Sequence, residues 1–99
     1  MKGTHGAAPL QAPACAALRA LIRPGVLGEY SAFARACGIN RKTLDRATRG
    51  GLIVVATKLA IYTAGAKAPA GSRPRAVARA MAPEMRPVVM ALLAPLEGL

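Results

Sequence analysis

Hydrophobic residues recur at spacings of three and four along the first half of the chain, which is the period of an amphipathic α-helix. Residues 14–22 (ACAALRALI) place their large aliphatic side chains on one face, and the helix breakers Pro24 and Gly25 follow. Residues 29–37 carry a second stripe, made of Tyr30, Phe33, Ala34 and Cys37. Both segments are therefore predicted to be helices that bury one face.

A third helix is predicted over residues 41–49, directly after the second. Gly38 ends the second helix, because glycine tolerates the left-handed conformation found at helix C-termini. Asn40 is a favourable N-cap for the helix that follows. Leu44 and Ala47 share the apolar face of this helix, and two glycines end it.

Residues 52–64 (LIVVATKLAIYTA) leave two interpretations open. Their β-branched content favours a strand, so a two-stranded wing after the third helix is conceivable. No Asn-Gly or Asp-Gly pair divides the segment into a hairpin, however. We favour a helix, which would lie centrally or at an interface because it has little polar surface.

The rest of the chain is divided by composition. Residues 1–13 contain Gly and Pro with little periodicity and predict a flexible leader, and residues 67–74 predict a linker. One globular domain then covers residues 14–66, and residues 75–99 form a helical arm. Pro87 would remove a helical hydrogen bond, so a break or kink is predicted between Ala82 and Pro87. The arm's hydrophobic stripe consists of Val77, Met81, Met85, Val88, Val89, Leu92, Leu93 and Leu96.

The charge balance is strongly positive, with 14 Lys and Arg against 4 Asp and Glu and a formal net charge of +10. Such a field attracts polyanions, of which nucleic acid is the commonest for a small basic domain and anionic membrane the second. A merely solvated cationic surface is the alternative. No apolar run approaches the roughly 18 residues of a membrane span, so a cytoplasmic, nucleoid-associated protein is predicted.

Candidate catalytic and metal chemistry is scarce. Cys15 and Cys37 lack the spacing of a zinc motif, and the single histidine, His5, lies in the predicted leader. No metal site and no cofactor are predicted. An enzyme, a catalytic residue and a small-molecule substrate are not expected either, because no nucleophile–base arrangement is visible. Cys37 is expected to be a reduced, buried thiol, although a disulfide with Cys15 stays open.

Two short helices joined by a tight glycine-containing turn, the second of them basic, form the helix-turn-helix arrangement. It requires a small residue where the helices cross, glycine in the turn, and apolar residues that hold the second helix at two points. The chain meets these requirements at Ala34, Gly38, Ile39, Leu44 and Ala47. The predicted fold is all-α, a small helix-turn-helix bundle of about four helices with a C-terminal helical arm.

The run AFARACGINRKTLDRATRGG resembles the helix-turn-helix of bacterial and phage regulators, and the pattern of residues 18–64 is similar to the lambda-repressor/Cro-like family. GINRKTL also resembles the start of the recognition helix in Fis-type proteins. In those proteins the motif ends the chain, whereas nearly half of this chain follows it. Ala47 is smaller than the branched residue usual in the family, and the fourth helix is richer in β-branched residues.

The resemblance implies that the N-terminal part of helix 41–49 enters the DNA major groove. Arg41 and Lys42 are then the candidates for contacts to guanine, and Arg49 is better placed for a phosphate. Asn40 caps the helix or contacts a phosphate, and Arg46 reaches a base edge or the backbone.

Further contacts are weaker predictions, each with an alternative. Thr43 contacts a thymine methyl group or a phosphate, or else packs inward, and Arg35 contacts a phosphate or is solvated. Asp45 either forms a salt bridge with Arg41, four residues away, or accepts a hydrogen bond from cytosine. Tyr30 hydrogen-bonds a phosphate or packs in the core, and packing is favoured.

A sequence-specific transcriptional regulator is the predicted function, specifically a repressor that binds a palindromic operator as a homodimer. Its partners are double-stranded DNA and a second copy of the chain, with no membrane. The hydrophobic stripe of the arm is the predicted dimerisation surface, with packing inside one chain as the alternative. Two other functions stay open: a non-specific nucleoid or RNA-binding protein, and a helical interaction module for an acidic protein.

Overall fold

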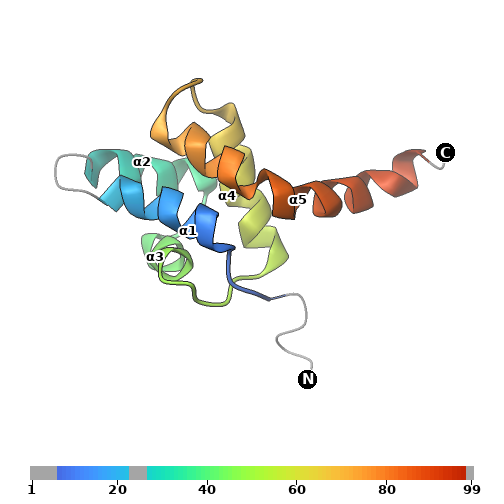
Figure 1. Ribbon diagram of the computed structural model, residues 1–99, viewed down its shortest axis with the longest axis horizontal. Coiled ribbons are helices and arrows are strands. Elements are labelled where there is room, and N and C mark those ends of the chain that lie inside the picture. The colour runs from blue at the N-terminus through green and yellow to red at the C-terminus, as the bar shows by residue number, and fades with distance from the viewer. Residues whose placement is uncertain (1–6, 23–26, 98–99) are drawn as a thin grey trace.

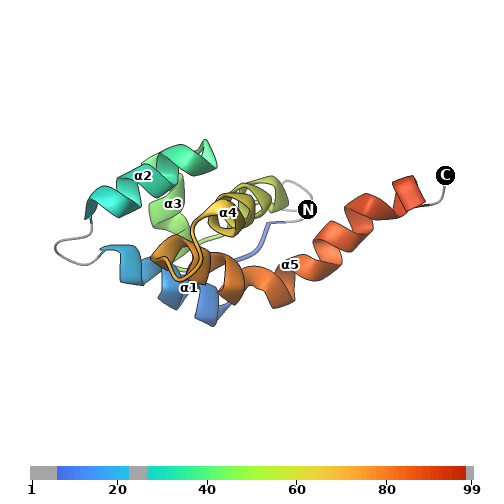
Figure 2. The ribbon, with the colours of Figure 1, turned by 90° about the horizontal axis from the view of Figure 1, so that it is seen from above.

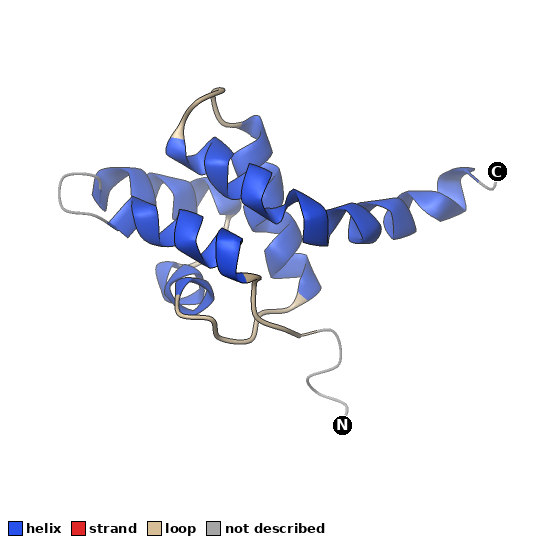
Figure 3. Cartoon of the chain, in the orientation of Figure 1, coloured by secondary structure: helices blue, strands red, loops and turns tan. Residues whose placement is uncertain are grey.

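Helices account for nearly all of the regular structure in the computed structural model, which describes residues 7–22 and 27–97, with side chains at 7–21 and 30–91. The elements are α1 (Ala12–Arg19), a 3-10 turn η1 (Ala20–Ile22), α2 (Leu27–Cys37), α3 (Arg41–Thr48), α4 (Val55–Lys67) and α5 (Arg73–Glu97). Figure 3 shows only helices and loops within the described residues. The all-α prediction is confirmed, while the break predicted at Pro24 and Gly25 lies outside the described residues.

The core lies where α1, α2 and α4 meet the first half of α5, and α3 closes it from one side (Figure 1). α1, α2, α3 and the first half of α5 contribute apolar residues at three-and-four spacing, and α4 contributes Ile61. The largest fully buried side chains are those of Leu18, Leu21, Tyr30, Leu44, Ile61, Val77, Met81 and Met85. Packing of Tyr30 in the core, the favoured alternative for this residue, is confirmed.

The glycines predicted to end α2 and α3 adopt the left-handed conformation, with φ of 72° at Gly38 and 78° at Gly50. At the end of α2, the Gly38 and Ile39 amides donate to the carbonyls of Arg35 and Ala34, at 3.0 and 3.3 Å. The end of α3 repeats this pattern through Gly50 and Gly51. These paired bonds satisfy carbonyls that a helix C-terminus otherwise leaves without partners.

Residues 52–64 are mainly helical, as favoured, but α4 begins only at Val55. Ile53 instead forms an isolated antiparallel bridge with Ala8, through hydrogen bonds of 3.0 and 3.2 Å in both directions. Leu10 follows the bridge and is buried in the core. The predicted leader is therefore wrong for residues 8–13, because backbone pairing and an apolar contact hold this segment against the fold. Residues 1–6 lie outside the described part.

α5 corrects two predictions about the C-terminal region. It begins at Arg73, inside the predicted linker, and continues to Glu97 without the break expected near Pro87. A proline removes one hydrogen bond and bends a helix but does not have to end it. The axis of α5 does change direction midway, and its second half extends away from the other helices (Figure 2).

The predicted dimerisation stripe is divided between two environments. Val77, Met81 and Met85 are fully buried against the protein's own helices, so for these residues packing within one chain replaces the predicted dimer contact. Val88 and Val89 are half-buried. The dimer contacts predicted for Leu92, Leu93 and Leu96 concern side chains outside the described residues.

A nearly buried ion pair ties three helices together. Nζ of Lys58, in α4, lies 3.6 Å from Oε2 of Glu84, in α5. The two side chains are 11% and 9% exposed, respectively. Glu84 Oε1 also accepts a 3.0 Å hydrogen bond from the backbone amide of Gln11, the residue that precedes α1. This carboxylate therefore satisfies both a buried ammonium and an amide at the start of a helix, where negative charge is favourable.

Candidate nucleic-acid interface

α2 and α3 are joined by the three residues Gly38, Ile39 and Asn40. The Asn40 side chain accepts hydrogen bonds from the amides of Lys42, at 2.8 Å, and Thr43, at 3.3 Å. These contacts confirm the predicted N-cap. They also fix the direction of α3 relative to the turn, because two of its first amides are bound to a residue outside the helix.

The uncharged residues predicted to hold this pair of helices are buried as expected. Ala34 is 4% exposed, Leu44 and Ala47 are fully buried, and Ile39 packs against the core. Since Leu44 and Ala47 lie three residues apart, they share one face of α3 and anchor it to the core. The opposite face is available for charged residues.

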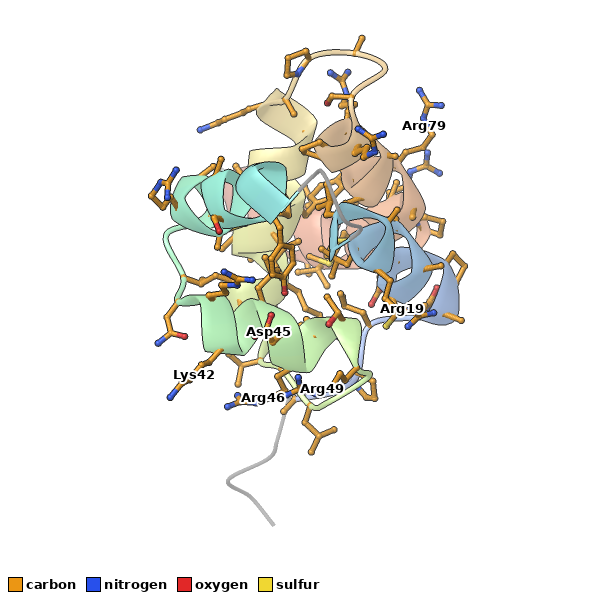
Figure 4. All side chains as sticks on the ribbon, turned by 90° about the vertical axis from the view of Figure 1, so that its left-hand side faces the viewer. Arg19, Lys42, Asp45, Arg46, Arg49 and Arg79 are labelled. Atoms are coloured by element: carbon orange, nitrogen blue, oxygen red, sulfur yellow. The ribbon has the colours of Figure 1, made fainter. Side chains whose placement is uncertain are left out.

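A surface that we call the outward cations consists of Lys42 and Arg46 of α3 and of Arg49, the residue directly after the helix. All three are exposed, and they point away from the protein in Figure 4, whereas Asp45 points toward the other helices. Their spacing of four and three places them on neighbouring turns of one face. Sequence and structure agree that this face carries concentrated positive charge.

The backbone of Gly51 packs directly against Arg46. A Cβ atom at Gly51 would lie 2.5 Å from Cγ of Arg46 and 3.1 Å from its carbonyl oxygen. A side chain at position 51 would therefore displace the stem of Arg46.

Asp45 points inward, and among the described residues it forms no ion pair with Arg41, while its contact with cytosine stays a prediction. Its Oδ1 accepts a 2.5 Å hydrogen bond from the hydroxyl of Tyr30, and the side chain is half-buried on the inward side of α3. A buried tyrosine hydroxyl requires an acceptor, and Asp45 is the one that α3 offers. Burial, reinforced by the hydrogen bond to Asp45 and by its charge, raises the pKa of Tyr30 well above its ordinary value of 10.0.

Arg41 lies apart from the outward cations. Its guanidinium carbon is 5.3 Å from the centre of the Tyr30 ring, a cation–π distance, and Nη1 lies 3.4 Å from Oγ of Ser31. The side chain therefore lies along α2 instead of projecting from the start of α3. A contact from Arg41 to a base would require the guanidinium to leave the tyrosine ring.

A residue that sequence patterns did not single out holds the other end of α3. Arg19 of α1 donates from Nη1 to the carbonyl of Thr48, at 3.1 Å. The Thr48 hydroxyl in turn donates to the carbonyl of Asp45, at 2.7 Å. A cation suits a helix C-terminus, but no local signal connects Arg19 with a helix 29 positions later.

Thr43 is half-buried, and Arg35 is exposed in the last turn of α2. The half-buried position of Thr43 does not distinguish the predicted contact with DNA from the predicted inward packing. Arg35 is accessible on the helix that precedes the turn.

Both cysteines are free, so the disulfide alternative is wrong. Cys15 is buried, with Sγ 3.4 Å from the carbonyl of Ala47, and Cys37 is half-buried. Burial raises the pKa of Cys37 to about 11. The described residues contain no cluster of three or more His, Cys, Asp or Glu able to bind a metal ion. Within the same ranges, no helix has the length and apolar character needed to cross a membrane.

Comparisons of the chain with protein-family models, with curated proteins and with solved structures give no match. Any functional conclusion therefore depends on the geometry of α2, α3 and the residues that support them.

Proposed function

We propose that the chain is a sequence-specific DNA-binding protein that regulates transcription, with α3 as the helix that enters the major groove. The observation that carries this proposal is the division of α3 into two faces. Leu44, Ala47 and Asp45 fasten one face to the protein, and the outward cations occupy the other.

An α-helix fits the width of the major groove, and cations along its exposed face meet both guanine acceptors and phosphates. A helix that only displayed charge to water would not need its direction fixed. α3 is held by Asn40 at its start, Tyr30 at its middle and Arg19 at its end. Such fixed orientation is what base contacts require, because their hydrogen bonds tolerate little displacement.

The proposed contacts follow from where each cation points. Lys42, at the start of α3, and Arg46, one turn later, are the candidates for base edges, and Arg49 for a phosphate. Arg41 remains a candidate base contact that has to exchange its contact with Tyr30 for one with DNA. Arg35, Asn40 and Thr43 are placed along the same motif as candidate backbone contacts.

A homodimer is part of the proposal. The second half of α5 extends from the fold and carries Val88, Val89 and the 57% exposed Met90. Pairing of this surface between two copies would present two α3 helices to a palindromic operator, with half-sites about 34 Å apart. Occupation of a promoter by such a dimer would repress transcription, which assigns the protein to the nucleoid.

Selection from a random duplex pool tests the proposal. We expect an enriched palindromic site that the full chain binds at least about 10³-fold more tightly than unrelated duplex at physiological salt. Replacing Arg86, an exposed arginine of α5, with alanine serves as the charge control and should leave this ratio unchanged. Equal affinity for all duplexes would instead indicate a non-specific nucleoid protein. No binding even at low salt would indicate an acidic protein partner.

A further inference from the structure

An open pocket of about 300 Å³ lies between α2, α4 and the first turn of α5. Its walls comprise Ala32, Phe33 and Ala36 of α2, Ala64 and Lys67 of α4, and Pro74 of α5. The lining is mainly alkyl and aromatic, with one charged group. Such a lining is typical of sites for small molecules. The volume of the pocket lies at the lower end of the range usual for such sites.

Lys67 determines which charge the pocket prefers. Among the described residues of the lining it alone is charged, and its side chain is exposed in the last turn of α4. An ammonium group only donates hydrogen bonds, so its natural partner is an anionic acceptor. The net charge of +10 favours anions further and disfavours cations.

The size of the apolar lining restricts the rest of the ligand. The alanine methyl groups leave space that larger side chains would fill, and Phe33, itself only 3% exposed, lies among the lining residues. An unbranched alkyl chain or a single aromatic ring suits a space of this volume.

We propose that this pocket binds a small monocarboxylate with an apolar body. The carboxylate pairs with Lys67, and the body packs on the alanine methyl groups and Phe33. The ligand contacts α2, which also carries Tyr30 and thereby holds Asp45 of α3. The site goes beyond the proposed DNA binding and does not depend on it, so it is tested without DNA and the two proposals fail separately.

NMR titration of the isotope-labelled full chain with heptanoate, 1-heptanol and heptylamine tests the site. With heptanoate we expect saturable shifts confined to amides of residues 32–36 and 64–68. Heptanol should bind about fivefold more weakly, because it cannot form an ion pair with Lys67. This factor corresponds to the strongest ion pairs found at exposed positions. Heptylamine should bind more weakly still, because Lys67 repels it.

Three variants separate charge from shape. Lys67→Met keeps the alkyl stem and should weaken heptanoate about fivefold without changing heptanol. Arg86→Met removes one charge from an exposed position elsewhere and should leave both probes unchanged. Ala36→Leu, at an exposed helical position, should fill the pocket and abolish the shifts.

Any of four results with the probes would overturn the proposal: equal affinity for the three probes, full heptanoate affinity in Lys67→Met, shifts scattered over the arginine-rich surface, or no binding up to probe solubility. Shifts of the same amides that depend on protein concentration without any probe would assign the pocket to a second copy and also overturn it.

Discussion

The hydroxyl of Tyr30 donates to Oδ1 of Asp45 across the interface between α2 and α3. Tyr30 is fully buried, and the guanidinium of Arg41 lies over its ring. One side chain of α2 therefore contacts two residues of α3, one near its start and one at its middle. Tyr30 therefore helps to position α3, together with the turn that precedes the helix.

Tyr30→Phe should lower the free energy of unfolding by about 1–3 kcal/mol, because it leaves a half-buried carboxylate without its donor. Urea denaturation measures this difference. Tyr62→Phe is the matched control, since Tyr62 is half-buried in α4 and is expected to lose less than about 0.5 kcal/mol. Equal losses in the two variants would contradict a specific role for the Tyr30–Asp45 bond.

Glu84→Leu should cost about 3–5 kcal/mol, because it leaves the Lys58 ammonium buried without a counter-charge. The double variant Lys58→Met/Glu84→Leu should recover most of this loss, since no charge then remains buried. Denaturant unfolding of the two single variants and the double variant gives the coupling free energy. A double variant as unstable as Glu84→Leu alone would show that the bond to the Gln11 amide, and not the ion pair, is the larger contribution.

Cys37 should react slowly with thiol reagents at pH 8. Raising its pKa from 9.0 to about 11 lowers the thiolate fraction about 100-fold, and the thiolate is the reactive form. Mass spectrometry after timed alkylation follows Cys37 separately from the buried Cys15. A rate equal to that of the urea-unfolded chain would contradict the prediction.

The same shift affects stability at high pH. The folded-state pKa of Cys37 lies above the unfolded value, so its contribution to stability is complete below pH 9 and is lost as the pH rises toward 11. Cys37→Ala should reduce the loss of stability over this window relative to the parent chain. An unchanged pH dependence in the variant would contradict this assignment.

Lys42→Ala should cost about 1–3 kcal/mol on the selected operator and relax its base preference, as expected for a base contact. Arg49→Ala should weaken binding to all duplexes alike and reduce the salt slope by about one, as expected for a phosphate contact. Binding curves at several salt concentrations separate the two effects. Identical behaviour of the two variants would show that Lys42 and Arg49 do not have separate roles as base and phosphate contacts.

Met90→Glu should convert the proposed dimer to monomer, because it places a charge on the exposed apolar surface of α5. Sedimentation equilibrium measures the change. Ala76→Glu adds the same charge to an exposed position in the first half of α5 and should leave the dimer intact. A parent chain that sediments as a monomer at all concentrations would remove dimerisation from the proposal.

Local sequence signals predicted the end of α2 and the start of α3 correctly, because the responsible contacts span only a few residues. Gly38 and Asn40 are examples, since each acts on amides or carbonyls within four positions. Contacts between distant segments were missed. The pairing of Ala8 with Ile53 and the bond from Arg19 to Thr48 join residues whose separation leaves no periodic signal.

The site was predicted in part for the same reason. Spacing alone placed Leu44 and Ala47 inward and the outward cations on the opposite face. It did not separate Asp45 and Arg41 from that face, because their positions depend on Tyr30, eleven or more residues earlier. Likewise, the stripe of α5 marked apolar residues without distinguishing contacts within the chain from contacts with a second copy.

The two-faced construction of α3 also bears on how such a protein can change its target. Lys42 and Arg49 are exposed, and the contacts that hold the helix are made by other residues. Substitutions at these two positions should therefore alter what the helix binds at little cost in folding. A library randomised at both, selected against different duplexes, would sample new preferences on an unaltered scaffold. Arg46 differs, because its stem packs against the backbone of Gly51 and its replacement would also change that contact.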